Sequence, residues 1–311
     1  MLKLAILVPT FNRAESLQRA LSSLTAQVSG TSDVELIVID NNSADETPDV
    51  CGRFAGVRYL FEPKQGLSHA RNAGVAAIRG FSPSDAVAFV DDDVEVAPGW
   101  LEAVRRAFAA HLEIDGIGGR VLPQNSSEFP DWMTSSHWAP LALQDHGNQV
   151  REFSAHEPVG LIGANVAFRK RVFDRLGVFS PHVQRVKDSI GSTEDHEFLV
   201  RLYAAGGKVL YVPDALVTTR VPPERMTREY HRRWHRGHGR FHAVMEGVEL
   251  PQVSRRLFGV PAHLFRSAAT DAMAWLRGMV SRDAASAFAA ETRLWFFSGF
   301  LKERCACLAR R

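Results

Sequence analysis

Residues 85–93 read DAVAFVDDD, a short apolar run that ends on three consecutive aspartates. An apolar run of about four to eight residues that stops at charged residues is typical of a strand covered on both faces, as in the parallel sheets of α/β proteins. Such sheets bind their ligands beyond the carboxyl ends of the strands. The stretch therefore predicts a buried strand that carries Asp91, Asp92 and Asp93 at the ligand-binding edge of a sheet.

The segments around this strand alternate between the periodicity of strands and that of helices. Leucines at positions 17, 21 and 24 form a helical stripe, whereas VELIVID at 34–40 is a continuous apolar run that ends on a carboxylate. Further strands are predicted at 4–8 and 57–61, and further helices at 66–77 and 101–111. This order predicts an α/β fold with a mostly parallel, Rossmann-like sheet flanked by helices.

The chain is less regular after this alternation. Residues 123–157 contain prolines, tryptophans and polar residues with little periodicity, which indicates a long irregular segment over the sheet. Regular structure is predicted again over 159–169, then in a helix over 194–205 and a strand over 208–212.

Beyond Pro222 the chain becomes basic and aromatic. Two amphipathic helices are predicted around 262–280 and 284–302. We therefore expect an α/β domain over 1–220 and a helical, basic and aromatic extension over 221–311.

The composition is that of a folded protein. Of 311 residues, 45% are hydrophobic and 23% are charged, so the chain can bury a core. The formal net charge of +2 excludes a chain-wide polycation that coats nucleic acid. The three cysteines, Cys51, Cys305 and Cys307, argue against a disulfide framework and favour a reducing compartment. Because neither a signal peptide nor a spanning apolar run is found, we expect the protein in the cytoplasm.

The aspartate cluster at 91–93 is the first candidate for chemistry. Adjacent carboxylates repel one another, and a hard divalent cation would relieve that repulsion. Mg²⁺ is typically held by one or two carboxylates together with substrate phosphates. The cluster indicates a Mg²⁺ or Mn²⁺ site, and a solvated acidic turn is the alternative that stays open.

Asp40 is the second candidate, at the end of the strand over 34–40. A carboxylate here can accept a hydrogen bond from a nucleobase or a ribose hydroxyl, as acidic residues do in dinucleotide-binding folds. It can equally cap the turn into the next helix, and Asp40 alone does not decide between the two interpretations.

Glu194 and Asp195 follow Ser192-Thr193 at the start of a predicted helix. Acidic residues stabilise a helix N-terminus by up to about 1 kcal/mol, which would be a purely structural role. A carboxylate in this position can also act as a general base.

Five stretches, taken in chain order, resemble family 2 glycosyltransferases. They are VPTFNR at 8–13, VIDNNSADET at 38–47, GLSHARNAG at 66–74, FVDDD at 89–93 and TEDHEFLVRLYAAGGKVLYVPDA at 193–215. The resemblance covers about two-thirds of the chain, and the five motifs keep the family's order. It implies a GT-A fold, a nucleotide-diphosphate sugar donor and inversion at the anomeric carbon. It also divides the domain over 1–220 into a nucleotide-sugar half at about 1–120 and an acceptor half at about 121–220.

The resemblance implies roles for individual residues. Asp93 and Asp91 would ligate the metal ion, and Asp195, with Glu194 beside it, would be the catalytic base. The positions that would line the nucleotide-sugar pocket are Pro9, Thr10, Asn12, Arg13, Asp40, Asn42, Arg71, Asp91 and Asp92.

Two departures from the family pattern are visible. Many relatives carry a histidine where this chain has Thr219, so a third protein contact to the metal or diphosphate is left to Arg220, Arg225 or His231. The Q-x-x-R-W element of processive members is reduced to its Arg-Trp pair. With no spanning helix, this favours a non-processive enzyme that adds a single sugar.

The run from Arg220 to Arg240 is rich in arginine and histidine. Guanidinium groups match phosphate oxygens, so Arg220 and Arg225 are candidates for binding the donor diphosphate. Contact with an anionic lipid or a lipid-linked diphosphate is a second interpretation, and a solvated helix a third. Nucleic-acid binding is not expected, because no aromatic-interleaved module accompanies the run.

Aromatic and basic residues also intermingle over 255–311, as they do in helices that lie on membrane surfaces. The same residues could equally serve to pack this segment against the α/β domain or a second subunit. Peripheral contact with the cytoplasmic face of a membrane is therefore one of two interpretations, and the oligomeric state stays undetermined.

The predicted function is an inverting, metal-assisted transfer of a sugar from a nucleotide-diphosphate donor to a glycan or lipid-linked acceptor, as in polysaccharide biosynthesis. One alternative is a catalytically silent protein that binds nucleotide sugars. Another is a nucleotidyltransferase, although the glycine-rich phosphate loop of that class is absent near Pro9-Thr10.

Overall fold

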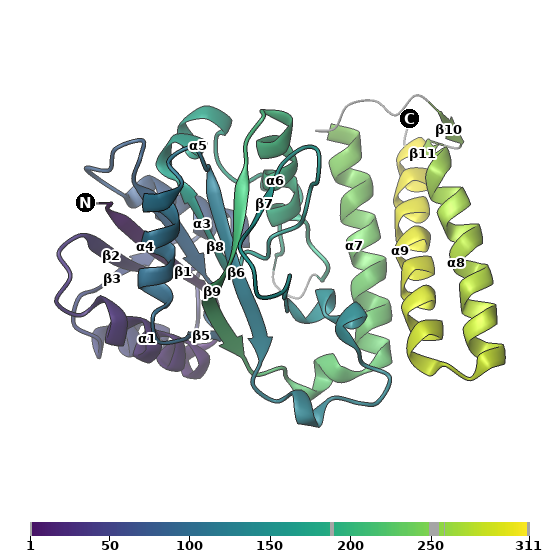
Figure 1. The fold of residues 1–311 in the computed structure, drawn as a ribbon, viewed down its shortest axis with the longest axis horizontal. Coiled ribbons are helices and arrows are strands. Elements are labelled where there is room, and N and C mark those ends of the chain that lie inside the picture. The colour runs from purple at the N-terminus through teal and green to yellow at the C-terminus, as the bar shows by residue number, and fades with distance from the viewer. Residues whose placement is uncertain (1, 187–189, 249–254, 258, 310–311) are drawn as a thin grey trace. The chain divides into compact units, whose positions relative to one another are not determined.

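The computed structural model describes residues 2–186, 190–248, 255–257 and 259–309 (Figure 1). These residues form two compact units. The first unit comprises Met1–Gln124, Ala142–Pro181 and Glu194–Arg220, and the second comprises Asn125–Leu141, His182–Thr193 and Val221–Arg311.

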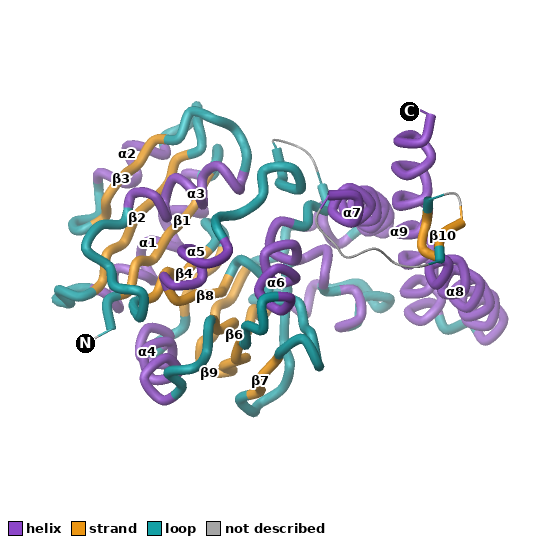
Figure 2. Tube along the Cα trace, turned by 90° about the horizontal axis from the view of Figure 1, so that it is seen from above, coloured by secondary structure: helices purple, strands orange, loops and turns teal. Residues whose placement is uncertain are grey.

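The first unit is built on one sheet, in which the described residues form nine strands (Figure 2). Their spatial order is β3-β2-β1-β4-β8-β6-β9-β5, and β7 pairs with β9. The strands are β1 Leu4–Thr10, β2 Val34–Asp40, β3 Val57–Phe61, β4 Ala86–Val90, β5 Val94–Val96, β6 Gly116–Pro123, β7 Arg151–Phe153, β8 Asn165–Arg169 and β9 Val209–Thr219.

Strands β3, β2, β1 and β4 run parallel, as do β6 and β9, whereas β8, β5 and β7 run antiparallel to their neighbours. The predicted α/β fold with a mostly parallel, helix-flanked sheet is thereby confirmed. In the parallel part, Thr10 is paired with Asp40 and Leu7 with Phe89. The carboxyl ends of β1, β2 and β4 therefore meet at one edge of the sheet.

Helices cover both faces of this sheet. They are α1 Ala14–Val28, α2 Thr47–Gly52, α3 Leu67–Ala77, α4 Trp100–Ala110, α5 Lys170–Leu176 and α6 Glu194–Ala204. One buried cluster joins Leu7, Ile39 and Phe89 on the strands to Phe173 of α5 and Phe198 of α6. Helices α1 and α4, which contact each other, lie on the opposite face (Figure 1).

Strand β9 is longer than predicted. The sequence predicted a strand over 208–212, but β9 continues to Thr219. Its pairing with β6 shifts between Gly119 and Arg120, so the irregularity is absorbed without ending the strand.

The segment over 123–157 is also less irregular than predicted. It contributes β7 to the sheet and three 3₁₀ turns to the second unit. The 3₁₀ turns of the second unit are η1 Ser126–Glu128, η2 Ser135–His137, η3 Ala139–Leu141 and, later in the chain, η4 Pro223–Met226.

The second unit is mainly helical, and the predicted helical extension is confirmed. Its helices are α7 Arg228–Val248, α8 Ala262–Ser281 and α9 Ala284–Ala309, and a short hairpin is formed by β10 Arg256–Leu257 and β11 Val260–Pro261. Helix α9 packs between α7 and α8 (Figures 1 and 2). Among the described residues, no helix combines the length and hydropathy needed to cross a bilayer.

Candidate active site

One arginine ties the carboxyl ends of β1 and β4 together. Arg13 follows β1, and its Nη1 donates to Oδ2 of Asp93 at 2.7 Å and to Oδ1 of Asp92 at 3.1 Å. The buried Asp92 also accepts a hydrogen bond from Oγ1 of Thr10 at 2.7 Å. Burial raises the pKa of the Asp92 carboxyl, although the charge of Arg13 opposes the shift. Asp92 thus fastens β4 to β1.

Asp91 and Asp93 differ from Asp92 in their exposure. Their side chains are 26% and 27% exposed, whereas that of Asp92 is 6% exposed. Asp92 is covered because Thr10 and Arg13 bind its carboxylate in the turn between β4 and β5. The two outer carboxylates are therefore the ones that can meet a ligand.

A second arginine connects this cluster to α6. Arg71 of α3 is fully buried, its Nη1 donates to Oδ1 of Asp195, and its Nη2 lies 3.5 Å from Oδ1 of Asp91. The guanidinium lies 5.3 Å from the ring centre of Phe179 and 5.7 Å from that of Phe89. Burial alone would lower the pKa of Arg71, but the charges of Asp195 and Asp91 raise it, so the bridge stays charged.

Asp195 has a further fixed contact on its other oxygen. Its Oδ2 accepts a hydrogen bond from the backbone N–H of Gly163 at 3.0 Å. One turn later in α6, Phe198 stacks on Phe179 with ring centres 4.6 Å apart. Burying a phenylalanine side chain contributes about 1.5–3 kcal/mol, so the start of α6 is anchored in the core. The Asp195 side chain is nevertheless 29% exposed.

Four carboxylates gather around two guanidinium groups in this assembly: Asp91, Asp92, Asp93 and Asp195 lie next to Arg13 and Arg71. Gathered carboxylates are the groups to which a divalent cation binds in proteins.

The residues present fit a magnesium or manganese ion. Asp91 and Asp93 offer partly exposed carboxylate oxygens, the ligands that hard cations prefer. The described residues contain no cluster of three or more His, Cys, Asp or Glu side chains placed to hold a metal. Mg²⁺ commonly needs only one or two carboxylates, because waters and substrate phosphates complete its shell.

Hydrogen bonds join the loop after β1 to the loop after β2. Asn12 and Asn42 have φ values of 52° and 68°, a left-handed conformation that asparagine tolerates. Oδ1 of Asn12 accepts a hydrogen bond from the backbone N–H of Ala44 at 2.7 Å. The backbone N–H of Asn12 donates to Oγ of Ser43 at 2.9 Å. Pro9 is buried inside β1, opposite Ile39. The Asn42 side chain is exposed at the edge.

Asp40 is buried and already engaged by the protein. Its Oδ1 accepts from the backbone N–H of Ser43 at 2.8 Å, and its Oδ2 accepts from the Tyr59 hydroxyl at 2.7 Å. These contacts are of the turn-capping kind, and they hold the loop that carries Asn42.

Thr219 lies beside the aspartate cluster. Its Oγ1 donates to the backbone carbonyl of Asp93 at 2.8 Å, and it is paired with Val94 across β5 and β9. The residue that replaces the relatives' histidine thus supports the backbone of Asp93 instead of reaching toward a ligand.

The remaining predicted residues lie in different environments. Glu194 is buried next to Asp195, and Arg220 is exposed at the end of β9. Arg225 is half-buried in η4 of the second unit. His231 is fully buried with its ring centre 5.2 Å from that of Trp132, and burial lowers its pKa to about 4. The suggestion that His231 contacts the diphosphate was wrong, because its ring belongs to the core of the second unit.

Sequence reasoning missed two residues that shape the site. Nδ2 of the buried Asn41 donates to the Lys64 carbonyl at 2.7 Å, and its Oδ1 accepts from the Gly66 N–H at 2.7 Å, which positions the loop before α3. Gly163 holds Asp195 through its backbone. The available signal for Gly163 was a glycine inside the regular segment predicted over 159–169, because such a glycine often marks the close approach of another part of the chain.

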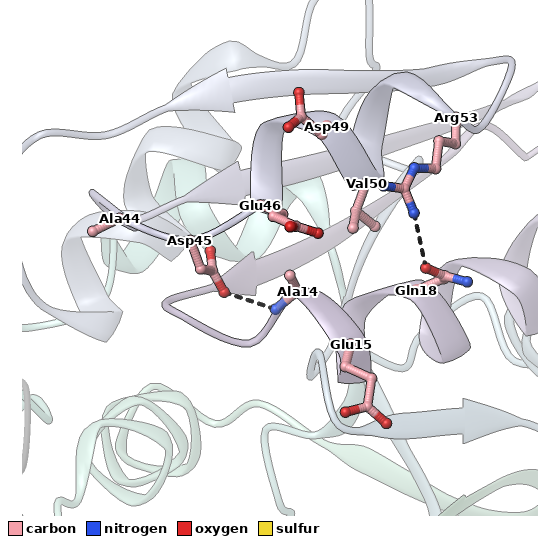
Figure 3. Close-up of a pocket in the computed structure, with 9 residues that line it drawn as sticks. All are labelled: Ala14, Glu15, Gln18, Ala44, Asp45, Glu46, Asp49, Val50 and Arg53. Carbon is pink, nitrogen blue, oxygen red and sulfur yellow. Dashed lines mark hydrogen bonds between the residues drawn. The ribbon is translucent and has the colours of Figure 1, made fainter.

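A separate cavity of about 680 Å³ lies between α1 and α2 (Figure 3). Its lining includes Glu15, Asp45, Glu46 and Asp49, and Asp45 caps α1 by accepting from the N–H of Ala14 at 2.9 Å. None of the predicted site residues lines it.

Substituting Gly163 by alanine is expected to reduce catalytic turnover at least about tenfold. A Cβ at this position would lie within 2.5 Å of both carboxylate oxygens of Asp195 and would also strike Arg71. The carboxylate must therefore move, and misplacement by about 1 Å can reduce a rate by up to 10²-fold. Gly160→Ala is the matched control, because a Cβ there meets nothing within 4 Å. Steady-state kinetics of both variants provide the measurement, and equal rates would show that Gly163 does not position the Asp195 carboxylate for the reaction.

The comparisons with known proteins agree with this geometry. Residues 5–177 match the family described as Glycosyl transferase family 2. A glucosyl-dolichyl phosphate glucuronosyltransferase of Haloferax volcanii is 23% identical over 229 residues, which cover 71% of this chain and 70% of the relative. A pre-mycofactocin glycosyltransferase of Mycobacterium tuberculosis is 28% identical over 68% of this chain but only 41% of its own length.

The fold has solved counterparts as well. A mannosyltransferase from Pyrobaculum calidifontis, solved with GDP-Man and Mn²⁺, superposes with a TM-score of 0.63 at 17% identity and covers 97% of this chain and 86% of its own. The family match spans more than half of the chain, and the curated relatives are glycosyltransferases. This protein is therefore a glycosyltransferase of family 2 with a GT-A type fold.

Proposed function

We propose that the protein transfers a sugar, with inversion, from a nucleotide-diphosphate donor to a hydroxyl group of a glycan or lipid-linked acceptor. The observation that carries the proposal is the bridge from Asp195 through Arg71 to Asp91, which brings a partly exposed carboxylate next to the cluster at the end of β4.

Asp195 is the proposed general base. An acceptor hydroxyl is a poor nucleophile, so a carboxylate must remove its proton as it attacks the anomeric carbon. Arg71 and the Gly163 N–H hold the two oxygens of Asp195 in fixed directions. By analogy with inverting glycosidases, a single base and a direct displacement give inversion without a covalent intermediate. Glu194 lies beside Asp195 and is proposed to support it.

Asp91 and Asp93 are the proposed ligands of Mg²⁺ or Mn²⁺. When bound, such an ion would neutralise the charge that grows on the leaving diphosphate. Arg13 holds Asp93 in place, and Thr219 supports the Asp93 backbone. Arg220, exposed at the end of β9, and Arg225 are proposed to contact the diphosphate.

The loops that carry Asn12 and Asn42 are proposed to form the nucleotide pocket, together with Pro9, Thr10, Arg13 and Asp92. Asp40 is proposed to face the base or ribose. Since its two oxygens also accept from Ser43 and Tyr59, it would form the rigid end of that pocket. The GDP-Man bound by the mannosyltransferase neighbour supports a donor of the nucleotide-diphosphate sugar class.

The acceptor and the location are proposed from the relatives. The name of the Haloferax relative describes a lipid-linked substrate, glucosyl-dolichyl phosphate, which supports a lipid-linked or glycan acceptor. A role in polysaccharide biosynthesis is part of the proposal. Cys51, Cys305 and Cys307 are free thiols, in keeping with a reducing compartment. We therefore place the reaction at the cytoplasmic face of a membrane.

A screen of nucleotide sugars by thermal denaturation tests the donor class. The matching donor is expected to raise the melting temperature by several degrees when Mn²⁺ or Mg²⁺ is present, because a ligand at 100 times its Kd stabilises the native state by about 2.7 kcal/mol. The shift should shrink in chelator. A donor that stabilises the protein but is never transferred or hydrolysed would instead identify a catalytically silent nucleotide-sugar-binding protein.

A further inference from the structure

Helix α8 has an apolar face that the second unit leaves exposed. Of the eleven exposed large hydrophobic side chains among the described residues, four lie in its last nine positions. They are Met273, Leu276, Met279 and Val280, with exposures of 51%, 55%, 59% and 86%. Met273, Leu276 and Val280 are spaced by three and four residues and therefore share one face of the helix. We call this surface the α8 face.

The opposite side of α8 is fixed against α9. Gly278 is buried against Ala287, so closely that a Cβ there would lie 2.8 Å from the Ala287 nitrogen. In the first turn of α8, Phe265 also packs on Phe297 of α9, with ring centres 5.2 Å apart. The helix is thus held rigidly, and the α8 face is presented as a preformed surface.

Basic side chains border the α8 face. Arg266, Arg277 and Arg282 are exposed, and the first two lie on one flank of the apolar stripe. The acidic side chains of α8 and α9 are engaged within the unit. Asp271 accepts from Arg293 at 2.6 Å, Glu291 from Arg232 at 2.6 Å and Glu303 from Arg240 at 2.9 Å.

The charges around the α8 face favour one of two possible binding partners, an anionic lipid surface, over a second copy of the chain. A second copy bound through a two-fold axis would place the same patch against itself. The arginines would then face arginines, and Asp283, the exposed carboxylate next to Arg282, already accepts from the backbone N–H of Ser286 at 3.0 Å. A surface of anionic headgroups over an apolar layer complements both features, since apolar side chains insert at the boundary and arginines remain at the headgroups.

We propose that the α8 face docks on an anionic lipid bilayer, with Met273, Leu276, Met279 and Val280 inserted at the headgroup boundary and Arg266, Arg277 and Arg282 bound to lipid phosphates. The helix lies in the plane of the surface and does not cross it. The inference deepens the proposed function, because a lipid-linked acceptor would be presented at that surface. Only the biological reason for membrane docking rests on the proposed function; the proposed contacts of the α8 face with lipid do not.

Co-sedimentation of the full chain with vesicles is the test. Vesicles of phosphatidylcholine alone are compared with vesicles that contain phosphatidylglycerol, each at low and high salt. The full chain should bind the anionic vesicles and lose much of that binding as salt rises. Met273→Gln/Leu276→Gln should reduce the partition coefficient at least about tenfold, since two apolar side chains no longer insert. Arg266→Gln/Arg277→Gln should reduce it about twenty-five-fold at low salt, at about fivefold for each arginine.

The controls come from exposed residues of the first unit. Leu112 is 71% exposed and the Arg106 side chain is 63% exposed, so Leu112→Gln and Arg106→Gln remove similar groups elsewhere. Both controls should bind vesicles as the unchanged chain does. Circular dichroism melts of every variant show whether the fold is kept.

Three outcomes would overturn the inference. The full chain could fail to sediment with anionic vesicles, or the α8 variants could sediment as well as the controls. Light scattering could also show a dimer that Met273→Gln/Leu276→Gln converts to a monomer while vesicle binding stays unchanged, which would make the α8 face a subunit interface. The melting shift caused by a nucleotide sugar is measured on the same samples. A chain that keeps this shift but does not bind vesicles contradicts the membrane inference alone.

Discussion

Replacing Asp195 by asparagine is expected to reduce turnover by about 100-fold or more while donor affinity changes by no more than a few-fold. General-base catalysis contributes about 10² to 10⁴ in rate, and asparagine cannot accept the proton of an acceptor hydroxyl. Its amide oxygen can still accept from one of the two groups that hold Asp195, the Gly163 N–H or Arg71, so the side chain keeps one of its two contacts. Arg71 retains Asp91 as an ionic partner at 3.5 Å, which limits the loss of stability.

Steady-state kinetics and donor binding by calorimetry together provide the measurement. Asp214→Asn is the control, because the Asp214 side chain is 74% exposed and pairs only loosely with Arg106 at 3.3 Å. That variant should behave as the unchanged enzyme does. A loss of donor affinity as large as the loss of turnover would contradict the assignment. It would show that Asp195 serves mainly as the structural partner of Arg71 and as an acidic residue at the start of α6.

Removal of the metal, or of Asp93, is expected to have the second large effect. Excess chelator should abolish transfer, and Asp93→Ala should lower it by about 100-fold or more. Stabilisation of a leaving diphosphate by a metal ion is worth several kcal/mol, and each 1.36 kcal/mol is a factor of ten in rate. Arg13 keeps Asp92 as its partner in this variant, at 3.1 Å, so the junction of β1 and β4 should persist.

Activity assays with chelator and with added Mg²⁺ or Mn²⁺ test this expectation. Binding of the free nucleoside diphosphate, followed by thermal denaturation with and without metal, gives a readout that does not depend on catalysis. Asp49→Ala is a suitable control, because Asp49 is an exposed carboxylate on α2 outside the site. Full transfer activity in excess chelator would exclude a role of the metal in the reaction.

The strands and helices around the site follow from local patterns. The apolar runs that end at Asp40 and Asp91 predict buried strands with polar ends, and the structure has β2 and β4 there. The spacing of hydrophobic residues and the residue types that favour turns are properties of a few neighbouring positions, so they predict strands and helices directly from the sequence. The strand predicted over 208–212 shows the limit of such reasoning. In the structure β9 continues to Thr219, and its pairing with β6 shifts between Gly119 and Arg120.

The partners of the site residues depend on contacts between distant segments. Arg71 and Asp195 are 124 positions apart, and nothing in their local sequence indicates that one guanidinium would join Asp195 to Asp91. The same holds for Thr219, which reaches the Asp93 carbonyl only because β9 lies next to β5.

By itself, the sequence determined most of the strands and helices, the α/β class and the positions of the carboxylates at strand ends, because hydrophobic period and charge are local properties. The tertiary structure alone decided which of these groups are exposed and what they contact. Asp92 is buried between Asp91 and Asp93 because Thr10 of β1 and Arg13, in the loop after β1, are its partners. Likewise, α8 has apolar residues on more than one side, and only its packing on α9 decides that Gly278 is covered while Leu276 and Val280 remain exposed. A side chain's burial depends on neighbours that the chain brings together only when it folds.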